Sequence, residues 1–141
     1  MKKIISVSII SILIISVYAQ NSINQKIQYL QSFLYQYSLY ENKSDCKLWV
    51  NKAECQVEIG YTKFNLNDIK MTYRFHEQDK IHLVGFVCKL NENCIDMTDP
   101  SNGNHSFGNG YYFGFKTKQG CYTFMELIGD LRNTLNKYNG N

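Results

Sequence analysis

Apolar residues recur with two different periods along the chain, a helical one near both ends and an alternating one between them. After the first 20 residues, apolar side chains return every three or four positions, and Ser22 with Gln25 forms a capping-box pattern. These features predict an amphipathic helix with one apolar face. Its apolar positions are Ile23, Ile27, Leu30, Leu34 and Tyr37.

From Cys46 onward the period changes to two, which is typical of half-buried β-strands. The stretch DIKMTYRF at 68–75 shows it most clearly, because apolar and polar side chains alternate throughout. Turn-forming residues separate the segments, and residues 98–110 are expected to form a loop. The expected strands are residues 46–50, 55–64, 68–75, 81–90, 94–97 and 111–117.

A second amphipathic helix is predicted near the end of the chain. Thr123 and Glu126 form a capping box at its start, and Asn139-Gly140 is a stop pattern at its end. The apolar stripe consists of Phe124, Leu127, Ile128, Leu131 and Leu135.

This order of elements predicts an α+β domain, with an N-terminal helix, an antiparallel sheet of five or six strands and a closing C-terminal helix. We expect residues 20–141 to form one disulfide-stabilised domain. In its order of elements the chain resembles the pleckstrin-homology superfold, in which a small barrel or sandwich is closed by a C-terminal helix. The resemblance implies a fold and no activity.

Residues 1–19 have the layout of a secretory signal peptide. Two lysines precede an apolar stretch at 4–17, and Val-Tyr-Ala follows as a cleavage sequence ending at Ala19. The apolar stretch is shorter than the roughly 20 residues that a spanning helix needs, although a retained anchor is the alternative. We expect cleavage after Ala19, a secreted or lumenal protein, and no membrane association after cleavage.

The charge of the chain argues against nucleic-acid binding. Without the two leader lysines, 13 of the 15 basic residues remain against 12 acidic ones, and they form no basic stripe. No cofactor-binding motif is present, so we expect no cofactor. The sequons at 42–44 and 104–106 predict N-glycosylation of Asn42 and Asn104.

Five cysteines in a secreted chain favour disulfide bonds. Cys88 and Cys94 flank a predicted hairpin turn, and Cys46 and Cys55 flank another, so each pair is a candidate bridge. Cys121 is left over at the start of the last helix, where the helix terminus would lower its pKa. We expect it to be a buried free thiol in a monomer, with an intermolecular bridge in a dimer as the alternative.

Other chemistry has weaker support in the sequence. The cysteine spacings fit neither a zinc site nor a C-x-x-C redox pair, so no metal site is expected. The oxygen donors of the long loop are of the kind that calcium accepts, but their spacing misses the EF-hand pattern. These donors are Asp96, Asp99, Asn102 and Asn104.

Two alternatives to a binding protein remain open. A secreted hydrolase would use His76 or His82 with a nearby carboxylate, although no catalytic motif is present. QVEIG at 56–60 resembles the Q-x-V-x-G inhibitory loop of the cystatins, which implies protease inhibition through Gln56–Gly60. The chain departs from that family because it lacks a downstream Pro-Trp hairpin and ends in a helix.

The leading hypothesis is a small secreted, non-enzymatic protein that binds another protein or a small ligand. Its binding surface is expected at the 99–110 loop and the aromatic strand that follows, since loops and exposed aromatics commonly carry recognition. The candidate residues are Asp99, Asn102, Asn104, Tyr111, Tyr112 and Phe113.

Overall fold

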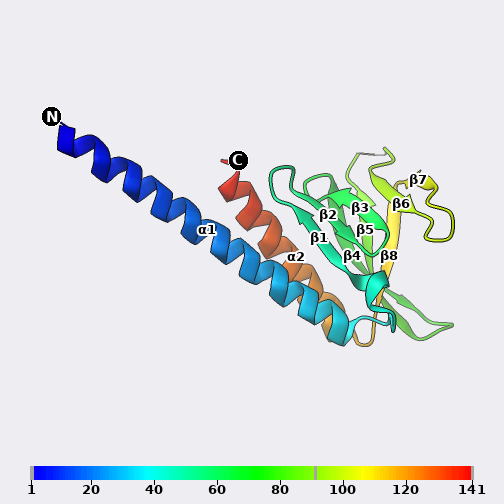
Figure 1. The fold of residues 1–141 in the computed structure, drawn as a ribbon. Helices are drawn as coiled ribbons and strands as arrows, with labels where there is room; N and C mark the ends of the chain where they lie inside the picture. Colours follow the sequence, from blue (N-terminus) through cyan, green and yellow to red (C-terminus); the bar gives the residue numbers. More distant parts are fainter. Residues whose placement is uncertain (1, 91, 141) are drawn as a thin grey trace.

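The computed structural model describes residues 2–90 and 92–140, with side chains described from residue 19 onward. It is an α+β domain with a helix at each end and antiparallel strands between them, so the predicted fold class is confirmed (Figure 1). The elements are α1 (Lys2–Tyr37), η1 (Lys43–Cys46), β1 (Leu48–Asn51), β2 (Gln56–Ile59), β3 (Thr62–Asn65), β4 (Ile69–His76), β5 (Ile81–Cys88), β6 (Ile95–Thr98), β7 (His105–Gly108), β8 (Gly110–Phe115) and α2 (Lys118–Tyr138).

The described strands form two sheets, a five-stranded one in the order β1-β2-β3-β6-β7 and a three-stranded one in the order β4-β5-β8. The chain passes between the sheets three times, from β3 to β4, from β5 to β6 and from β7 to β8. The two sheets are therefore halves of a bent meander, joined along a crease at 66–68, 89–90, 92–94 and Asn109. The five-stranded sheet matches the predicted strand number, and the likeness to the pleckstrin-homology superfold stays an analogy of element order.

Strand β7 corrects the prediction that all of residues 98–110 form a loop. Met97 pairs with Ser106 and Asp96 with Phe107, so the segment returns along β6 as a hairpin. Polar and glycine residues concealed the strand, but the β6 edge supplies backbone partners for it. The loop itself is reduced to the tight turn at 99–104.

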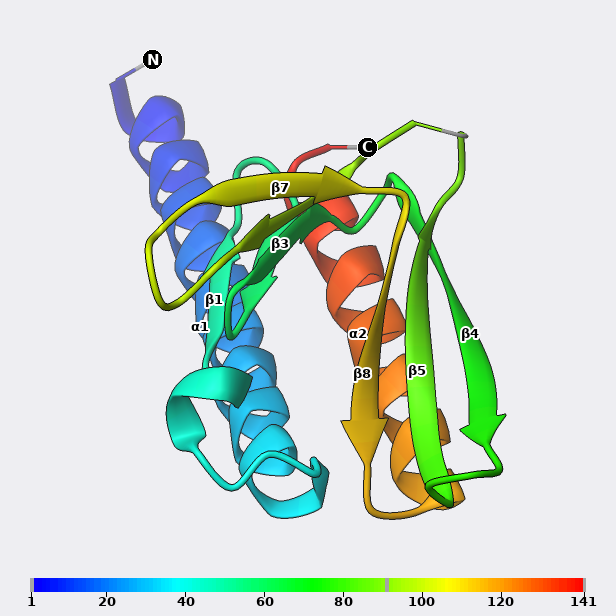
Figure 2. The same ribbon diagram turned by 90° about the vertical axis from the view of Figure 1, so that its right-hand side faces the viewer.

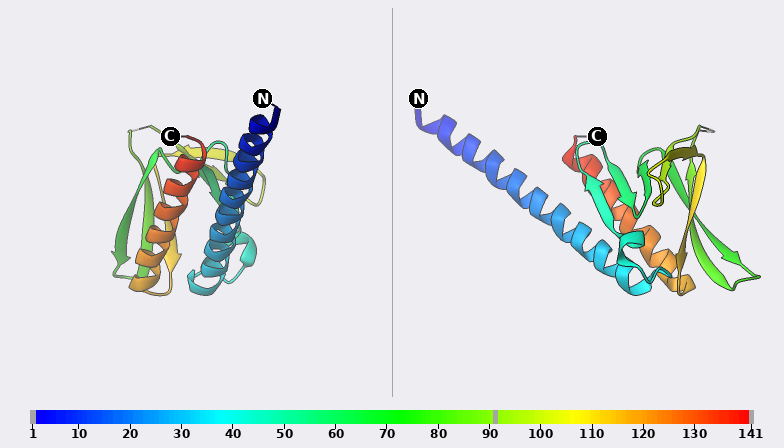
Figure 3. Two further views of the ribbon diagram at one scale, coloured as in Figure 1. Left: turned by 90° about the vertical axis from the view of Figure 1, so that its left-hand side faces the viewer. Right: turned by 45° about the vertical axis from the view of Figure 1, so that its right-hand side comes forward.

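The two helices lie side by side against the strands (Figures 1 and 3). Lys26 of α1 and Asp130 of α2 form an ion pair between them. The N-terminal half of α1 extends away from the rest of the molecule (Figure 3). Within the described chain, no helix combines the length and hydropathy that crossing a membrane requires.

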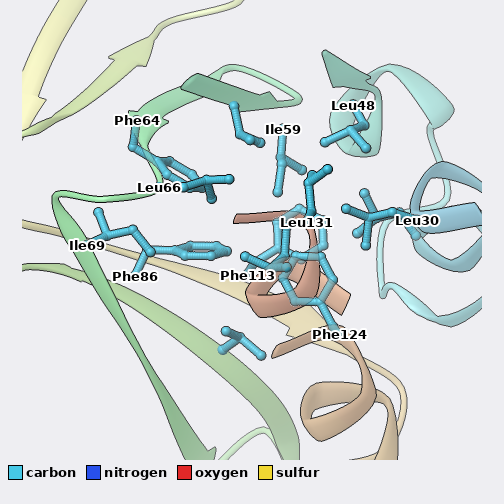
Figure 4. Packing of buried hydrophobic residues seen from close by; sticks show 14 of the residues in the cluster. Leu30, Leu48, Ile59, Phe64, Leu66, Ile69, Phe86, Phe113, Phe124 and Leu131 are labelled. Carbon is cyan, nitrogen blue, oxygen red and sulfur yellow. The ribbon is translucent and has the colours of Figure 1, made fainter. Parts of the chain in front are cut away.

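A cluster of aromatic side chains fills the space between α2 and the two sheets (Figure 4). Phe124 of α2 lies at its centre, with ring centroids 4.9 Å from Phe115, 6.1 Å from Phe113 and 6.0 Å from Phe86. Phe86 in turn lies 4.6 Å from Phe64, which links the two sheets. The core therefore depends on α2 and on both sides of the crease.

The predicted N-terminus of α2 at Thr123 is wrong. The helix begins at Lys118, because the Thr117 side chain caps it by accepting a hydrogen bond from the Gly120 amide at 3.0 Å. The buried face includes Gly120 and Cys121, so packing extends the helix through the predicted turn. The C-terminal prediction is confirmed, since Asn139 caps the helix and Gly140 has a φ of +78°. In the full chain, α1 also runs through Ser22 without starting there.

Candidate binding surface

The outer face of the five-stranded sheet carries one row of side chains that crosses every strand. Cross-strand pairing aligns Trp49 with Glu58, Glu58 with Lys63, Lys63 with Asp96, and Asp96 with Phe107. We call these five residues the outer row. Four inter-strand spacings of about 4.8 Å give it a width of about 19 Å.

Both ends of the outer row are exposed aromatic residues. Trp49 is 50% exposed and Phe107 is 61% exposed, and Tyr61 beside the row is 37% exposed. The charges between them alternate in sign along the row, an order that stabilises neighbouring strands in this register. Sheet pairing therefore accounts for the charged residues of the row but not for the exposed aromatic ones.

A shallow cleft of about 410 Å³ opens beside the Trp49 end of the outer row. Trp49 and Tyr61 contribute aromatic surface to it, and Lys47, Glu58 and Lys63 contribute charges. An aromatic side chain with charged neighbours offers both apolar contact and oriented polar contact.

Local structure holds this cleft in shape. The Gln31 side chain of α1 donates to the Cys46 carbonyl at 3.0 Å and accepts from the Leu48 amide at 2.6 Å, which fixes the start of β1. Gly60 has a φ of +60°, and a Cβ there would lie 2.3 Å from the Asp45 carbonyl oxygen. Only glycine allows the β2–β3 turn to approach η1 this closely.

The 99–104 turn lies at the β7 end of the same sheet. The Asp99 carboxylate accepts hydrogen bonds from the Ser101 amide at 2.8 Å, the Ser101 hydroxyl at 2.7 Å and the Asn102 side chain at 2.9 Å. The bonds from Ser101 hold the pKa of the Asp99 carboxyl below its usual value. The turn is therefore ordered by its own side chains.

The calcium interpretation finds no support in this geometry. The Asp96 carboxylate lies 2.8 Å from His105 Nδ1, and the Asn102 side chain accepts from the Asn104 amide at 2.8 Å. In the described part of the chain, no group of three or more His, Cys, Asp or Glu side chains is placed to hold a metal ion.

The aromatic half of the predicted binding surface is divided between the core and the surface, and Phe113 is wrong as a surface residue. Phe113 is buried at 0% exposure, and Tyr111 is partly buried against the core. Tyr112 is 42% exposed, but it lies on the three-stranded sheet. There the Arg74 guanidinium carbon lies 5.6 Å from the centroid of the Tyr112 ring. Alternation along β8, which the sequence predicted, turns Tyr111 and Phe113 toward the core and Tyr112 away from it. The sequence alone did not show which side is covered.

The hydrolase hypothesis placed His76 or His82 beside a carboxylate, and the two histidines lie on opposite faces of their sheet. His76 lies 3.1 Å from Asp79 in an exposed turn. His82 is partly buried, and its Nδ1 lies 2.9 Å from the Tyr73 hydroxyl. Since His76 pairs with Ile81, the next residue His82 points to the opposite face of the sheet.

The cystatin-like wedge is contradicted by the sheet. Gln56–Ile59 form β2, which pairs with β1 on one side and β3 on the other. A strand inside a sheet cannot enter a protease active site as a protruding loop, so this alternative is wrong.

The bridge between Cys88 and Cys94 is confirmed, with a Cα–Cα distance of 5.8 Å. It links Cys88 at the end of β5 to Cys94 directly before β6, and so ties the two sheets together at the crease. The predicted bridge between Cys46 and Cys55 is wrong, because both are buried free thiols. They lie at opposite ends of the β1–β2 hairpin, about 13 Å of strand apart, whereas a bridge needs Cα atoms within about 7 Å.

Cys121 is a buried free thiol, as expected. The helix terminus does not lower its pKa; burial instead raises the pKa of the thiol to about 11. At 0% exposure the sulfur cannot reach a second chain without unfolding, so the structure does not favour a dimer through this residue.

Both sequon asparagines are exposed in the structure. Asn42 caps η1 by accepting from the Ser44 amide at 3.2 Å, and Asn104 lies in the turn before β7. Their glycosylation stays a prediction.

The sequence interpretation missed Trp49, Tyr61 and Phe107 as surface residues. The alternation of side chains could have identified Trp49 as a surface residue. Trp49 stands between Leu48 and Val50 in a strand, so its side chain must point to the opposite face from theirs. Phe107 could not be placed in the same way, because its strand was not recognised. Comparison with protein-family models, curated proteins and solved structures finds no match to this chain.

Proposed function

We propose that this chain is a small secreted, non-enzymatic protein that binds another protein through the outer row and the adjoining cleft. The observation that carries the proposal is the exposure of Trp49 and Phe107 on one sheet face. Tryptophan and other aromatic residues are enriched where interfaces gain most of their binding energy.

The flat shape of this surface favours a protein over a small ligand. Small ligands bind in concave sites that bury most of their surface, whereas the cleft beside Trp49 is shallow and open. The outer row is about 19 Å wide and has aromatic residues at its ends and charged residues at its centre. It therefore offers the combination of apolar and polar contacts that is typical of a protein interface.

Secretion is part of the same proposal. The disulfide between Cys88 and Cys94 is compatible with an oxidising compartment. Cleavage after Ala19 would remove most of the projecting half of α1 and leave Ser22 and Gln25 near the new helix start, where their capping pattern has a physical role.

Affinity capture with matched variants tests this function. The secreted protein, immobilised through its C-terminus, is compared with a Trp49→Ala/Phe107→Ser variant in the medium of the cells that produce it. We expect at least one protein to be retained only by the wild type. Because Trp49 is the single tryptophan, its fluorescence then reports binding of a purified tryptophan-free fragment of that protein directly.

The control is Tyr112→Ser, which removes an exposed aromatic residue from the other sheet. Its retained proteins should equal those of the wild type. If the Trp49→Ala/Phe107→Ser variant retains the same proteins with equal affinity, the outer row is not the binding surface.

A further inference from the structure

Strand β4 forms an open edge of the three-stranded sheet (Figure 2). The opposite edge, β8, is covered by the chain after α1, since the Leu39 amide donates to the Gly114 carbonyl at 3.1 Å and the Lys116 amide to the Tyr37 carbonyl at 3.0 Å. Within the described residues, the backbone of β4 bonds only to β5. Every second one of its eight residues therefore presents N–H and C=O groups that are free to pair with another strand.

A shallow groove of about 490 Å³ lies between α2 and the first three residues of β4, Ile69–Met71. Met71 of β4 and Met125 of α2 are partly buried against the core and give it an apolar floor. The α2 residues that line it, from Tyr122 to Arg132, recur at helical spacing and so form one face. An extended segment beside β4 would therefore contact both the strand edge and this helix face.

Gly129 keeps the groove open. It lies in the middle of α2, where glycine costs about 1 kcal/mol of stability relative to alanine. A Cβ at this position would meet no atom within 4 Å, so close packing does not require glycine. Because Gly129 lines the groove, a large side chain there would occupy its space.

The rim of the groove is predominantly basic. Lys70, Lys89 and Arg132 line it against the single carboxylate of Glu126. None of the three basic side chains forms an ion pair within the described part of the chain. The Lys89 ammonium donates to the Asn67 carbonyl at 2.6 Å, but this neutral partner leaves its charge uncompensated. The charges of the rim are therefore available to an acidic ligand.

We propose that the groove binds an extended acidic peptide segment of another protein, which adds to β4 as a further strand. The free backbone groups of β4 need a strand as their partner, and the basic rim selects acidic side chains. A second copy of this chain fits less well, because antiparallel pairing of two β4 strands would bring Lys70 and Arg74 of both copies into one like-charged patch.

Selection from a display library of random peptides of about 12 residues tests the proposal on the purified protein. We expect enrichment of peptides in which acidic residues alternate with apolar ones. Arg132→Glu should weaken the binding of these peptides more than about tenfold, and Gly129→Phe should do the same by filling the groove. Hydrogen exchange should show new protection of β4 amides when a selected peptide is bound.

Two matched variants separate groove filling from damage to the fold. Gly129→Ala should keep the affinity and raise the stability, because alanine improves the helix without filling the groove. Trp49→Ala should leave peptide binding unchanged, so this test is independent of the proposed function of the outer row. If Gly129→Phe does not fold, Arg132→Glu decides the result alone.

Three outcomes would overturn the proposal. One is the absence of any enriched sequence, and another is the enrichment of peptides without acidic residues. The third is a dimer in sedimentation that Arg132→Glu or Gly129→Phe dissociates, which would show that a second copy occupies the β4 edge.

Discussion

On its inner face, the five-stranded sheet presents Phe64, which is 2% exposed and has its ring centroid 4.6 Å from that of Phe86. On its outer face it presents Phe107, which is 61% exposed. Phenylalanine is thus buried on the inner face of this sheet and exposed on its outer face. Packing explains the inner aromatic residues, and the proposed binding function would account for the outer ones. The predictions below test this difference, beginning with the largest effect.

The largest effect is expected in the core. Phe124→Ala should lower the free energy of unfolding by about 3 to 5 kcal/mol, because it leaves a cavity between α2 and both sheets. Urea unfolding measured by circular dichroism checks this value. A loss below about 1 kcal/mol would show that the aromatic cluster is not the centre of the core.

The second-largest effect on stability is expected at alkaline pH, where the buried Cys121 thiol ionises. The Cys121 thiol ionises near pH 9.0 in the unfolded chain and near 11 in the folded one. The unfolded state therefore loses its proton first, and stability should fall between these values by up to about 1.4 kcal/mol per pH unit. Below pH 9.0 the thiol causes no loss.

Chemical unfolding at a series of pH values checks this prediction, with Cys121→Val as the control. The variant should lose less stability between pH 9 and 10 than the wild type. Tyr40 adds a further loss at higher pH, because burial and the neighbouring Tyr111 raise its pKa. Equal slopes for both proteins below pH 10 would contradict the assignment to Cys121.

Removing the disulfide at the crease between the sheets should have a smaller effect on stability. Replacing Cys88 and Cys94 with serine opens a short loop, for which chain entropy predicts a loss of about 2 kcal/mol. Alanine at Cys46 should not produce the mass change of a broken disulfide, since that residue is a free thiol. Intact mass after alkylation, with and without reduction, checks both statements: three thiols alkylated only after unfolding, and two more after reduction.

The smallest effect on stability is expected on the outer face. Phe107→Ser and Trp49→Ala should each cost about 1 kcal/mol or less, because a large part of each side chain is exposed. Their effect on partner binding should exceed about tenfold. A loss of stability comparable to that of Phe124→Ala would remove the distinction between the two faces.

The sequence predicted what depends on local pattern. The helical periods and the alternation in residues 68–75 gave the correct classes of element, and the spacing of Cys88 and Cys94 gave the correct bridge. The helix stop at Asn139-Gly140 was also local, because it depends on one positive φ.

Tertiary packing decided what the sequence did not predict. The burial of Gly120 and Cys121 extends α2 back to Lys118, past the capping box at Thr123. Pairing with β6 turns residues 105–108 into a strand and so brings Phe107 into register with Asp96. The outer row is created by this register, so no short segment of sequence contains it.

Photo-crosslinking tests the central claim most directly. The photoreactive residue p-benzoylphenylalanine is placed at Phe107 on the outer row, and in a second protein at Tyr112 on β8 of the three-stranded sheet. Both proteins are irradiated in the medium of the producing cells. The account predicts discrete adducts with one protein from position 107 and none with that protein from position 112. No adduct at 107, or equal adducts at both positions, would contradict it.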